Sequence, residues 1–398
     1  MPRTPHVAVI GGGIIGCSAA AMLAERGVQV TLFEATAIGA GASGRNLGAI
    51  QHPFDPILAT LYHDSLDRYR RLAAGDDGFT VPEHPAGVLM INRDPDASRA
   101  QVAKLTAAVP ELEAEFLDPD AVAAAEPSLV PGFAACRLAT GYPIPPAWAT
   151  AAWARLAERG GAEFRIGAAV QPWLEGASVR GVRLDDGTTV AADAVLIAAG
   201  PWSPPLVDPT GAWAPIRRTW GVTVQLDLGA AAPSHVVEED EVDAVNRPIL
   251  AAARAAAGAP EADPPSLFSI ASATGISTLG STFMPAERDP APIARLLIVR
   301  GATYLPAIGT APVLEIRTCA RPQSADGRPF IGPVGGVGGL FVCAGNGPWG
   351  ISTGPGSAAL AVAAILDAAP LTPELAADRP IQPYFPKVLL TGERLQAR

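Results

Sequence analysis

Three glycines near the start of the chain have the spacing that a phosphate-binding turn requires. Gly11, Gly13 and Gly16 form the pattern G-x-G-x-x-G directly after the apolar run Val7-Ala-Val-Ile10. In such a turn the first glycine permits a tight bend, the second lets the backbone approach a pyrophosphate, and the third lets the next helix pack closely. The amides at the start of that helix, together with its dipole, attract the phosphates. The pattern therefore indicates dinucleotide binding.

An acidic residue follows at the distance expected for a ribose ligand. Apolar residues at helical spacing predict a helix that ends at Gly27, and residues 28–33 predict a second strand that ends at Glu34. A carboxylate at this place accepts hydrogen bonds from ribose hydroxyls and repels a 2′-phosphate. The complete unit favours a dinucleotide site over a purely structural turn, but it leaves both NAD and FAD open.

A second glycine pattern, near the other end of the chain, does not complete another such unit. The segment Gly345-Asn-Gly-Pro-Trp-Gly350 follows a predicted strand at 339–344 and precedes an apolar helix at 358–366. No strand ending in an acid comes after it, because the chain continues into a proline-rich tail. We expect this loop to offer backbone amides and a helix N-terminus to the ligand of the first unit.

The order of these segments predicts two interleaved domains. Strands that end in glycine lie at 7–10, 194–199 and 339–344, which suggests one sheet assembled from distant parts of the chain. The predicted dinucleotide domain comprises 1–84, 143–215 and 307–398, and a substrate domain comprises 85–142 and 216–306. Within the second domain, alternation predicts a strand at 219–228, and 289–302 predicts a helix.

Composition narrows the class of protein. The chain has 398 residues, of which 49% are hydrophobic, and a net charge of −10. With its Lys and Arg residues scattered, it offers no basic face for nucleic acid or for a membrane surface. No uninterrupted run approaches the ~18 apolar residues of a membrane helix, and the start does not resemble a signal peptide. We expect a cytoplasmic enzyme, and the sequence leaves both a monomer and a homo-oligomer open.

Cysteine and lysine are scarce. The four cysteines are far apart and form neither a redox pair nor a zinc-ligand spacing, so we expect no disulfide and no metal site. Lysine occurs only at Lys104 and Lys387. A mechanism that needs a lysine therefore has almost nothing to use.

Four separated blocks give the chain a family resemblance. They are the unit 11–34, the segment 39–48, the segment 198–203, and the pair 321–332 with 345–353. The sequence resembles the D-amino-acid oxidase, glycine oxidase and sarcosine oxidase group of flavoenzymes. That resemblance implies an α/β fold with a Rossmann-like FAD-binding domain, and a substrate domain whose mixed, largely antiparallel sheet roofs the flavin. The resemblance also favours FAD over NAD, because in that group the segment that corresponds to 39–48 wraps the pyrophosphate of FAD.

The same resemblance implies the residues that surround the cofactor. Glu34 would bind the adenosine ribose, Val170 the adenine through its backbone, and the last block the pyrimidine edge of the flavin. The expected cofactor residues are Gly11, Gly13, Ile14, Ile15, Gly16, Glu34, Ala35, Ala42, Ser43, Arg45, Asn46, Leu47, Gly48, Val170, Ala199, Gly200, Trp202, Cys319, Arg321, Gly345, Asn346, Gly347, Trp349, Gly350, Ile351, Ser352 and Thr353.

Arg321 is the expected substrate ligand. It matches the arginine that pairs with the substrate carboxylate in the amino-acid-oxidising branch, and a guanidinium can hold a carboxylate through two parallel hydrogen bonds. The alternative is a structural arginine at the junction of the two domains.

Cys319 and Thr278 mix the patterns of two branches. In sarcosine oxidases a cysteine at the position of Cys319 is joined to the flavin, so a covalent link is possible here, although a buried, unreactive cysteine is the alternative. In that branch a lysine that promotes reaction with oxygen stands where this chain has Thr278. Arg45 or His52 could supply the missing cation, and His52 could also shuttle protons or simply cap a loop.

These expectations define an activity. The chain would oxidise the C–N bond of a small amine or amino acid to an imine by hydride transfer to flavin N5, with O2 as acceptor and H2O2 as product. A dehydrogenase that passes electrons to a quinone or a protein, an NAD-dependent dehydrogenase, and a flavin-binding subunit of a larger complex remain as alternatives.

Overall fold

The strand–helix–strand unit predicted at the N-terminus is present. β1 (His6–Ile10), α1 (Ile14–Glu25) and β2 (Gln29–Glu34) follow one another, and the two strands pair in parallel. The structure is a computed structural model that describes residues 4–75, 78–240, 266–366 and 371–380. The predicted domain ranges also include 241–265 and 381–398, which lie outside the described residues.

Strands from both ends and from the middle of the chain form one six-stranded sheet. Its order is β18-β19-β12-β1-β2-β8, and only β18 runs antiparallel to its neighbour. The added strands are β8 (Glu163–Ile166), β12 (Ala194–Ile197), β18 (Phe330–Pro333) and β19 (Leu340–Ala344). The carboxyl ends of β1, β12 and β19, each followed by a glycine-containing loop, therefore meet at one edge, as predicted.

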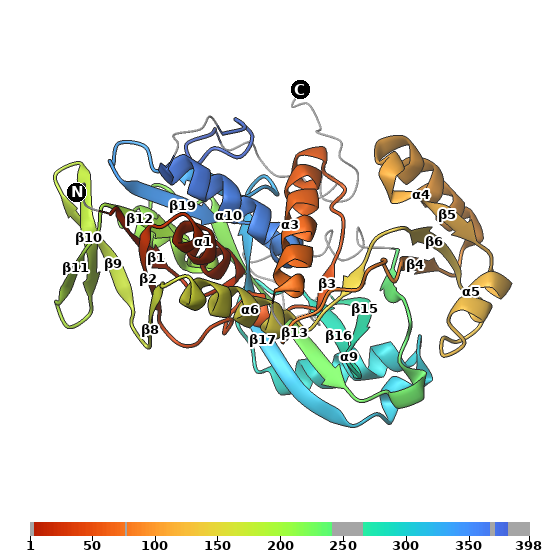
Figure 1. The fold of residues 1–398 in the computed structure, drawn as a ribbon. Helices are drawn as coiled ribbons and strands as arrows, with labels where there is room; N and C mark the ends of the chain where they lie inside the picture. The colour runs from red at the N-terminus through yellow and green to blue at the C-terminus, as the bar shows by residue number, and fades with distance from the viewer. Residues whose placement is uncertain (1–3, 76–77, 241–265, 367–370, 381–398) are drawn as a thin grey trace.

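Layers cover both faces of this sheet (Figure 1). On one face lie α1, α3 (Pro56–Ala74), α6 (Pro146–Arg159) and α10 (Gly350–Leu366), which share one apolar core with the sheet. On the other face lies a three-stranded sheet of β9 (Val170–Glu175), β10 (Ser178–Leu184) and β11 (Thr189–Ala191). The covered faces explain why the central strands are almost wholly apolar.

A second, eight-stranded sheet forms the other half of the molecule. Its order is β17-β13-β16-β15-β14-β4-β6-β5, and every pair is antiparallel except β14 with β4. Its strands are β4 (Val88–Asn92), β5 (Glu115–Leu117), β6 (Ala134–Leu138), β13 (Ile216–Leu226), β14 (Val236–Glu239), β15 (Ser266–Ala273), β16 (Ile276–Thr282) and β17 (Val313–Ser324). The expectation of a mixed, largely antiparallel sheet is confirmed.

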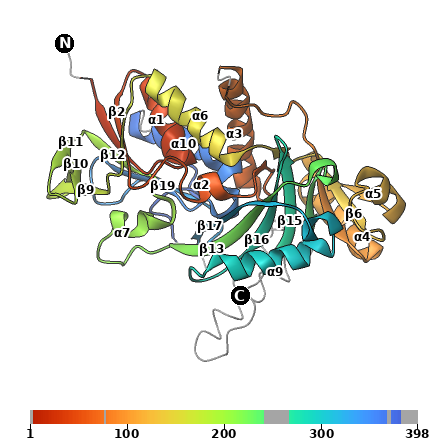
Figure 2. The same ribbon diagram turned by 90° about the horizontal axis from the view of Figure 1, so that it is seen from below.

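The two faces of the eight-stranded sheet have different partners. α9 (Pro290–Ala302) packs beneath one face, where Val222, Leu279 and Ile270 are buried (Figure 2). The opposite face lies toward residues 44–50, because Arg317 and Thr223 bond to backbone carbonyls there. We call this second face the roof. The roof covers the junction of the two halves.

The last strand of the roof crosses the predicted domain boundary. β17 pairs with β13 along its whole length, from Ile216↔Ser324 to Leu226↔Val313. The predicted range 307–398 assigns this strand to the dinucleotide domain, whereas the structure places it in the sheet of the other half. Sequence alone gives no boundary there, because β18 follows within a few residues and returns to the first sheet.

The remaining elements are short or lie at the far end of the second sheet. They are α2 (Ala42–Arg45), β3 (Ala49–Ile50), α4 (Pro95–Ala108), η1 (Pro110–Leu112), α5 (Pro119–Ala125), β7 (Tyr142–Pro143), η2 (Gly200–Trp202), α7 (Ser203–Val207), η3 (Gly229–Ala231), η4 (Pro306–Gly309) and η5 (Gly347–Trp349).

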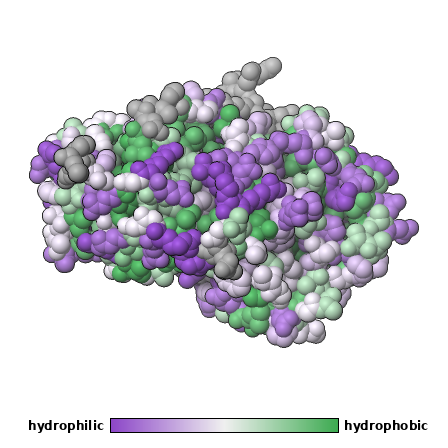
Figure 3. All heavy atoms as spheres, in the orientation of Figure 1, coloured by the Kyte–Doolittle hydropathy of each residue, from purple (hydrophilic) through white to green (hydrophobic). Residues whose placement is uncertain are grey.

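One segment is apolar and long enough to span a membrane by length and composition. It runs from Gly347 to Leu366 and contains α10. The sequence predicts no uninterrupted apolar run of this length, and this segment meets the criterion although glycines and prolines interrupt it. In the structure 61% of its most apolar window is buried, and α10 packs against α1 and α3 within the core. Its apolar composition is thus accounted for by packing, and hydrophilic side chains are spread over the face seen in Figure 3.

Candidate active site

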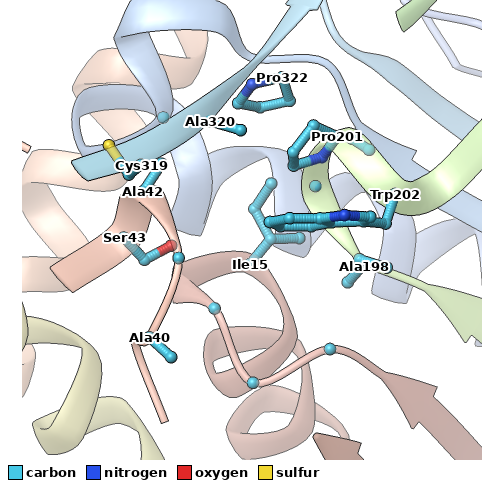
Figure 4. Close-up of a pocket in the computed structure, with 18 of the residues that line it drawn as sticks. Ile15, Ala40, Ala42, Ser43, Ala198, Pro201, Trp202, Cys319, Ala320 and Pro322 are labelled. Carbon is cyan, nitrogen blue, oxygen red and sulfur yellow. The ribbon is translucent and has the colours of Figure 1, made fainter. Parts of the chain in front are cut away.

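A cavity of about 740 Å³ lies where the two halves meet. It is bordered by the glycine-rich turn after β1, residues 40–46, the end of β12, strand β17 and the loop before α10 (Figure 4). Most of the residues predicted at the cofactor line it: Gly11, Gly13, Ile14, Ile15, Glu34, Ala35, Ala42, Ser43, Arg45, Asn46, Val170, Ala199, Gly200, Trp202, Cys319, Arg321, Asn346, Gly347, Gly350 and Ile351. The structure therefore brings the four sequence blocks together.

The three glycines of the turn differ in what a side chain would meet at each position. A Cβ on Gly16 would lie 1.9 Å from the carbonyl oxygen of Gly11. Gly11 has φ +113°, and its Cβ would lie 2.5 Å from the oxygen of Ala198. At Gly13, by contrast, the nearest obstacle is the Ser43 hydroxyl at 2.9 Å. Of the three, Gly13 is the one where a Cβ would meet a side chain rather than the backbone, and both Gly11 and Gly13 line the cavity.

The amino end of α1 also opens on the cavity. α1 begins at Ile14, whose amide donates to Ser43 Oγ at 2.9 Å. Both residues line the cavity, so the positive end of the helix dipole faces it. A diphosphate placed here would lie next to backbone amides, and Glu34 would lie farther along the cavity.

Glu34 marks the far end of the cavity. Its Oε2 accepts a hydrogen bond from the Gly12 amide at 2.7 Å, and its Oε1 accepts from the Thr36 amide at 2.8 Å. These bonds fix the carboxylate at the end of β2 while leaving lone pairs for further donors. Val170 and Ala35 line the same end. The arrangement fits a ribose with an adenine beyond it.

Arg321 lies at the β17 side of the cavity without an acidic partner. Its Nη1 donates to the oxygen of Thr282 at 2.9 Å, its Nη2 donates to Ser281 Oγ, and its guanidinium lies 4.7 Å from the Phe283 ring centroid. Among the described residues no carboxylate oxygen lies within ion-pair distance of it. Burial lowers the pKa of the Arg321 guanidinium from its ordinary value. A cation held by neutral groups at a cavity is suited to bind an anion.

Cys319, two residues earlier on β17, is also among the lining residues, and Figure 4 shows it beside Ala42 at the edge of the cavity. Its side chain is 6% exposed. Burial raises the pKa of the thiol, and the nearby charges of Arg321, Arg317 and Arg45 do not offset this. The thiol is therefore protonated near neutral pH, whereas bond formation requires a thiolate.

Several predicted residues do not line the cavity. Gly16, Leu47, Gly48, Gly345, Trp349, Ser352 and Thr353 support it from behind. Trp349 packs edge-on against Phe54, with 6.0 Å between ring centroids, and the Thr353 hydroxyl accepts from the Asn346 amide at 2.9 Å. These contacts hold the loop that precedes α10.

His52 is also outside the cavity lining. Its Nε2 lies 3.0 Å from Glu111 Oε1, and its backbone amide donates to the Thr140 hydroxyl. Burial lowers the pKa of His52, although Glu111 opposes this shift. The predicted role as a proton shuttle at the flavin is therefore without support from its position.

Two charged residues of the roof are missed by the sequence analysis. Arg317, 5% exposed, donates to the oxygen of Asn46 at 3.0 Å and lies 3.4 Å from Thr278 Oγ1. The carboxyl of Glu238 accepts from the Gln51 amide at 3.0 Å, and burial raises its pKa. No local motif marks either residue, since their partners are far away in the sequence.

Further lining residues are not among those predicted at the cofactor. They include Gly12, Thr36, Trp220, Glu287, Thr318 and Pro322. Thr318 and Pro322 alternate with Cys319 and Arg321 along β17, and the Thr318 carbonyl accepts from Arg45 Nη1 at 3.0 Å. Thr318 and Pro322 could have been predicted from Arg321. A strand that borders a cavity with its edge brings several consecutive residues to the cavity.

Comparisons with known proteins agree with this geometry. The model of a family described as FAD dependent oxidoreductase matches residues 6–364. Glycine oxidase from Pseudomonas aeruginosa is 28% identical over 388 residues, which cover 92% of this chain and 98% of that protein. A D-amino acid dehydrogenase from Cereibacter sphaeroides is 31% identical over 71% of this chain and 61% of its own length.

A solved structure supports the same fold. Glycine oxidase from Bacillus cereus ATCC 14579 has a TM-score of 0.76 to this chain at 24% identity, and the match covers 92% of this chain and 96% of that one. With the glycine turn, Glu34 and β17 gathered around one cavity, the family match over most of the chain leads to one conclusion. The chain belongs to the family of FAD-dependent oxidoreductases.

Proposed function

We propose that this enzyme oxidises a small amino acid at its C–N bond, with the substrate carboxylate held by Arg321. The observation that carries the proposal is the guanidinium of Arg321, which lines the cavity and, within the described part of the chain, donates hydrogen bonds to Thr282 and Ser281 and meets no carboxylate. A carboxylate is the anion that such a planar fork binds through two parallel hydrogen bonds. An amine without a carboxylate would leave this buried charge unpaired, which costs free energy.

The cavity fits FAD as the electron acceptor. Gly13 brings backbone without a side chain to the cavity, the first turn of α1 lines it, and Glu34 stands where a ribose would follow. We propose that Gly11, Gly13 and Ser43 hold the diphosphate. Glu34 and Val170 would hold the adenosine, and residues 346–351 would hold the flavin ring. When bound, FAD supplies an acceptor for two electrons as a hydride.

The residues of this chain would orient the reaction rather than remove a proton. Arg321 fixes the α-carbon relative to the ring, and positioning of this kind contributes much of the rate. The α-C–H bond breaks with its electron pair leaving as hydride, and the nitrogen lone pair forms the C=N bond of the imine. Water then hydrolyses the imine to an oxo acid and ammonia.

We propose O2 as the final acceptor, reduced to H2O2 by the same two electrons. Thr278 replaces the lysine that the resemblance leads one to expect, yet the buried guanidinium of Arg317 lies 3.4 Å from its hydroxyl. A fixed cation in this place favours negative charge that develops nearby. A dehydrogenase that uses a quinone or protein acceptor is the alternative, and the cytoplasmic location stays a prediction.

The test compares substrates with and without a carboxylate. Flavin-loaded protein is mixed anaerobically with D-, L- and N-methyl amino acids and with the matching decarboxylated amines, and flavin absorbance is followed. We expect an amino acid to bleach the flavin, and the variant Arg321→Met to raise KM by about 100-fold for it. Arg217→Met, at an exposed arginine on the neighbouring strand β13, is the matched control. Equal effects of the two variants would overturn the role of Arg321.

The acceptor is tested on the same sample. After reduction by substrate, air or a quinone is admitted and the rate of reoxidation is compared. Fast reoxidation in air with formation of H2O2 supports the oxidase, whereas reoxidation by the quinone alone supports the dehydrogenase.

A further inference from the structure

Two histidines and a glutamate from separate elements converge on the surface near α3. His52 follows β3, His63 lies on α3, and Glu111 lies on η1 of the other half. His52 Nε2 is 3.0 Å from Glu111 Oε1, and His63 Nε2 is 2.9 Å from Glu111 Oε2. The three side chains offer ligand atoms that all lie within 4.8 Å of one another. None of them lines the active-site cavity.

The inner part of this cluster is held in place. The His52 side chain is 4% exposed, its backbone amide donates to Thr140 Oγ1 at 2.9 Å, and its ring packs edge-on against Tyr62 at 4.8 Å. His63 and Glu111 are 54% and 48% exposed, so their side chains can adjust. The cluster thus has a fixed ligand on the inside and two adjustable ones at the water boundary.

We propose that His52, His63 and Glu111 bind one divalent transition-metal ion, Zn²⁺ in the first instance. Two imidazole nitrogens and one carboxylate oxygen form a ligand set that zinc uses, with water in the fourth position. With metal–ligand bonds of ~2.0–2.1 Å in a tetrahedron, ligand atoms stand about 3.3 Å apart. The observed atoms approach this spacing, and rotation of the exposed His63 and Glu111 side chains closes the remainder.

The metal would replace protons that the cluster shares. Each Nε2 now faces an oxygen of the same carboxylate, so each imidazole must carry a proton there to make its hydrogen bond. A bound metal ion would take the place of the proton at Nε2, and each neutral imidazole would then carry its one proton on Nδ1. The net charge of −10 also favours uptake of a cation.

A metal at this position would tie the two halves together. His52 belongs to the segment that leads away from the cavity residues 42–46, whereas Glu111 lies between α4 and β5 of the second half. The ion would therefore stabilise the junction without touching substrate. The proposal departs from the expectation from the sequence that the chain has no metal site.

The experiment uses flavin-loaded, tag-free protein that has been treated with a chelator and then dialysed. Calorimetric titration with Zn²⁺ is expected to show about one site per chain, and Co²⁺ is expected to give visible absorption bands beneath the flavin spectrum after subtraction. His63→Ala and Glu111→Gln change exposed side chains and should each weaken binding by at least about tenfold. His84→Ala, at an exposed histidine outside the cluster, should leave binding unchanged.

Two results would overturn the proposal. One is the absence of Zn²⁺ binding to the wild type, and the other is binding that His63→Ala and His84→Ala affect equally. Flavin absorbance reports whether each variant is folded, so a loss of binding with normal flavin content is assigned to the ligands. Substrate turnover is not the readout, and the outcome is therefore independent of the proposed oxidation.

Discussion

The guanidinium of Arg321 lies directly over the backbone of Gly221. A Cβ on Gly221 would approach Nη1 of Arg321 to 2.4 Å and its Cζ to 2.7 Å. The two residues belong to the paired strands β13 and β17, where Gly221 stands opposite Cys319. The missing side chain on one strand therefore makes room for the cation of the other.

Gly221→Ala should displace Arg321 from this position. We expect KM for a carboxylate substrate to rise by about tenfold or more, because a shift of the guanidinium weakens the paired hydrogen bonds, and overpacking should cost about 1–3 kcal/mol of stability. Steady-state kinetics and thermal unfolding measure the two effects. Gly335→Ala, where a Cβ meets nothing within 4 Å, is the control. An unchanged KM in Gly221→Ala would contradict this prediction.

Substitutions of two glycines in the first turn should have different effects, one on folding and the other on cofactor binding. Gly16→Ala places a Cβ 1.9 Å from a backbone oxygen, so we expect little folded protein. Gly13→Ala meets only the movable Ser43 hydroxyl, so we expect folded protein with low flavin content. Circular dichroism and the ratio of flavin to protein absorbance distinguish these outcomes.

A double variant checks the second half of that prediction. Gly13→Ala combined with Ser43→Ala removes the contact with the hydroxyl, but it still fills the space assigned to the diphosphate. Flavin content should stay low. If it returns to the wild-type value, the defect of Gly13→Ala arises from Ser43 and not from the cofactor.

FAD should be bound without a covalent link. Because burial raises the pKa of the Cys319 thiol, little thiolate is present to attack the flavin. Acid precipitation should leave the yellow colour in the supernatant, for the wild type and for Cys319→Ala alike. Colour that remains in the wild-type pellet and is absent from the Cys319→Ala pellet would establish the thioether instead.

Glu238→Gln should stabilise the protein above the usual titration range of a glutamate. Burial raises the pKa of Glu238 from 4.5 in the folded state, so ionisation is costlier there than in the unfolded chain. The wild type therefore loses stability as the pH rises from about 4.5 toward the folded-state pKa, and the glutamine variant does not. Urea unfolding at several pH values should show a difference that grows with pH and then levels off.

A matched substitution separates this effect from a general change in charge. Glu83 is exposed, so Glu83→Gln removes the same charge without relieving a buried carboxylate. Its stability relative to the wild type should vary little over the same pH range. A Glu238→Gln variant that follows the Glu83→Gln curve would show that burial of Glu238 costs nothing.

The sequence predicts those parts of the site whose chemistry requires a local pattern. Gly11, Gly13 and Glu34 are found because a tight turn, a bare backbone and a ribose ligand must follow one another at set distances. Arg321 is found because it stands in a recognisable block. In each case the information lies within a few dozen neighbouring residues.

The remaining residues depend on pairing between distant segments. Arg317 becomes a buried cation only because β17 pairs with β13 and faces the Asn46 backbone. Glu238 meets Gln51 across 187 positions of the chain. His52 looks like a residue of the flavin loop in sequence, yet it turns toward Glu111. Such contacts leave no periodicity or motif for sequence analysis to detect.

The crossing of the chain between the two sheets limits how this enzyme could have changed its substrate. The strands of the roof lie in three parts of the chain, namely 88–138, 216–239 with 266–282, and 313–324, and β18 re-enters the other sheet at Phe330. Recombination between two relatives would have to exchange all three parts at once to transfer the complete roof from one enzyme to the other. New specificity is therefore expected to arise through single replacements along the strands, and ancestral reconstruction should concentrate on the side chains of the roof.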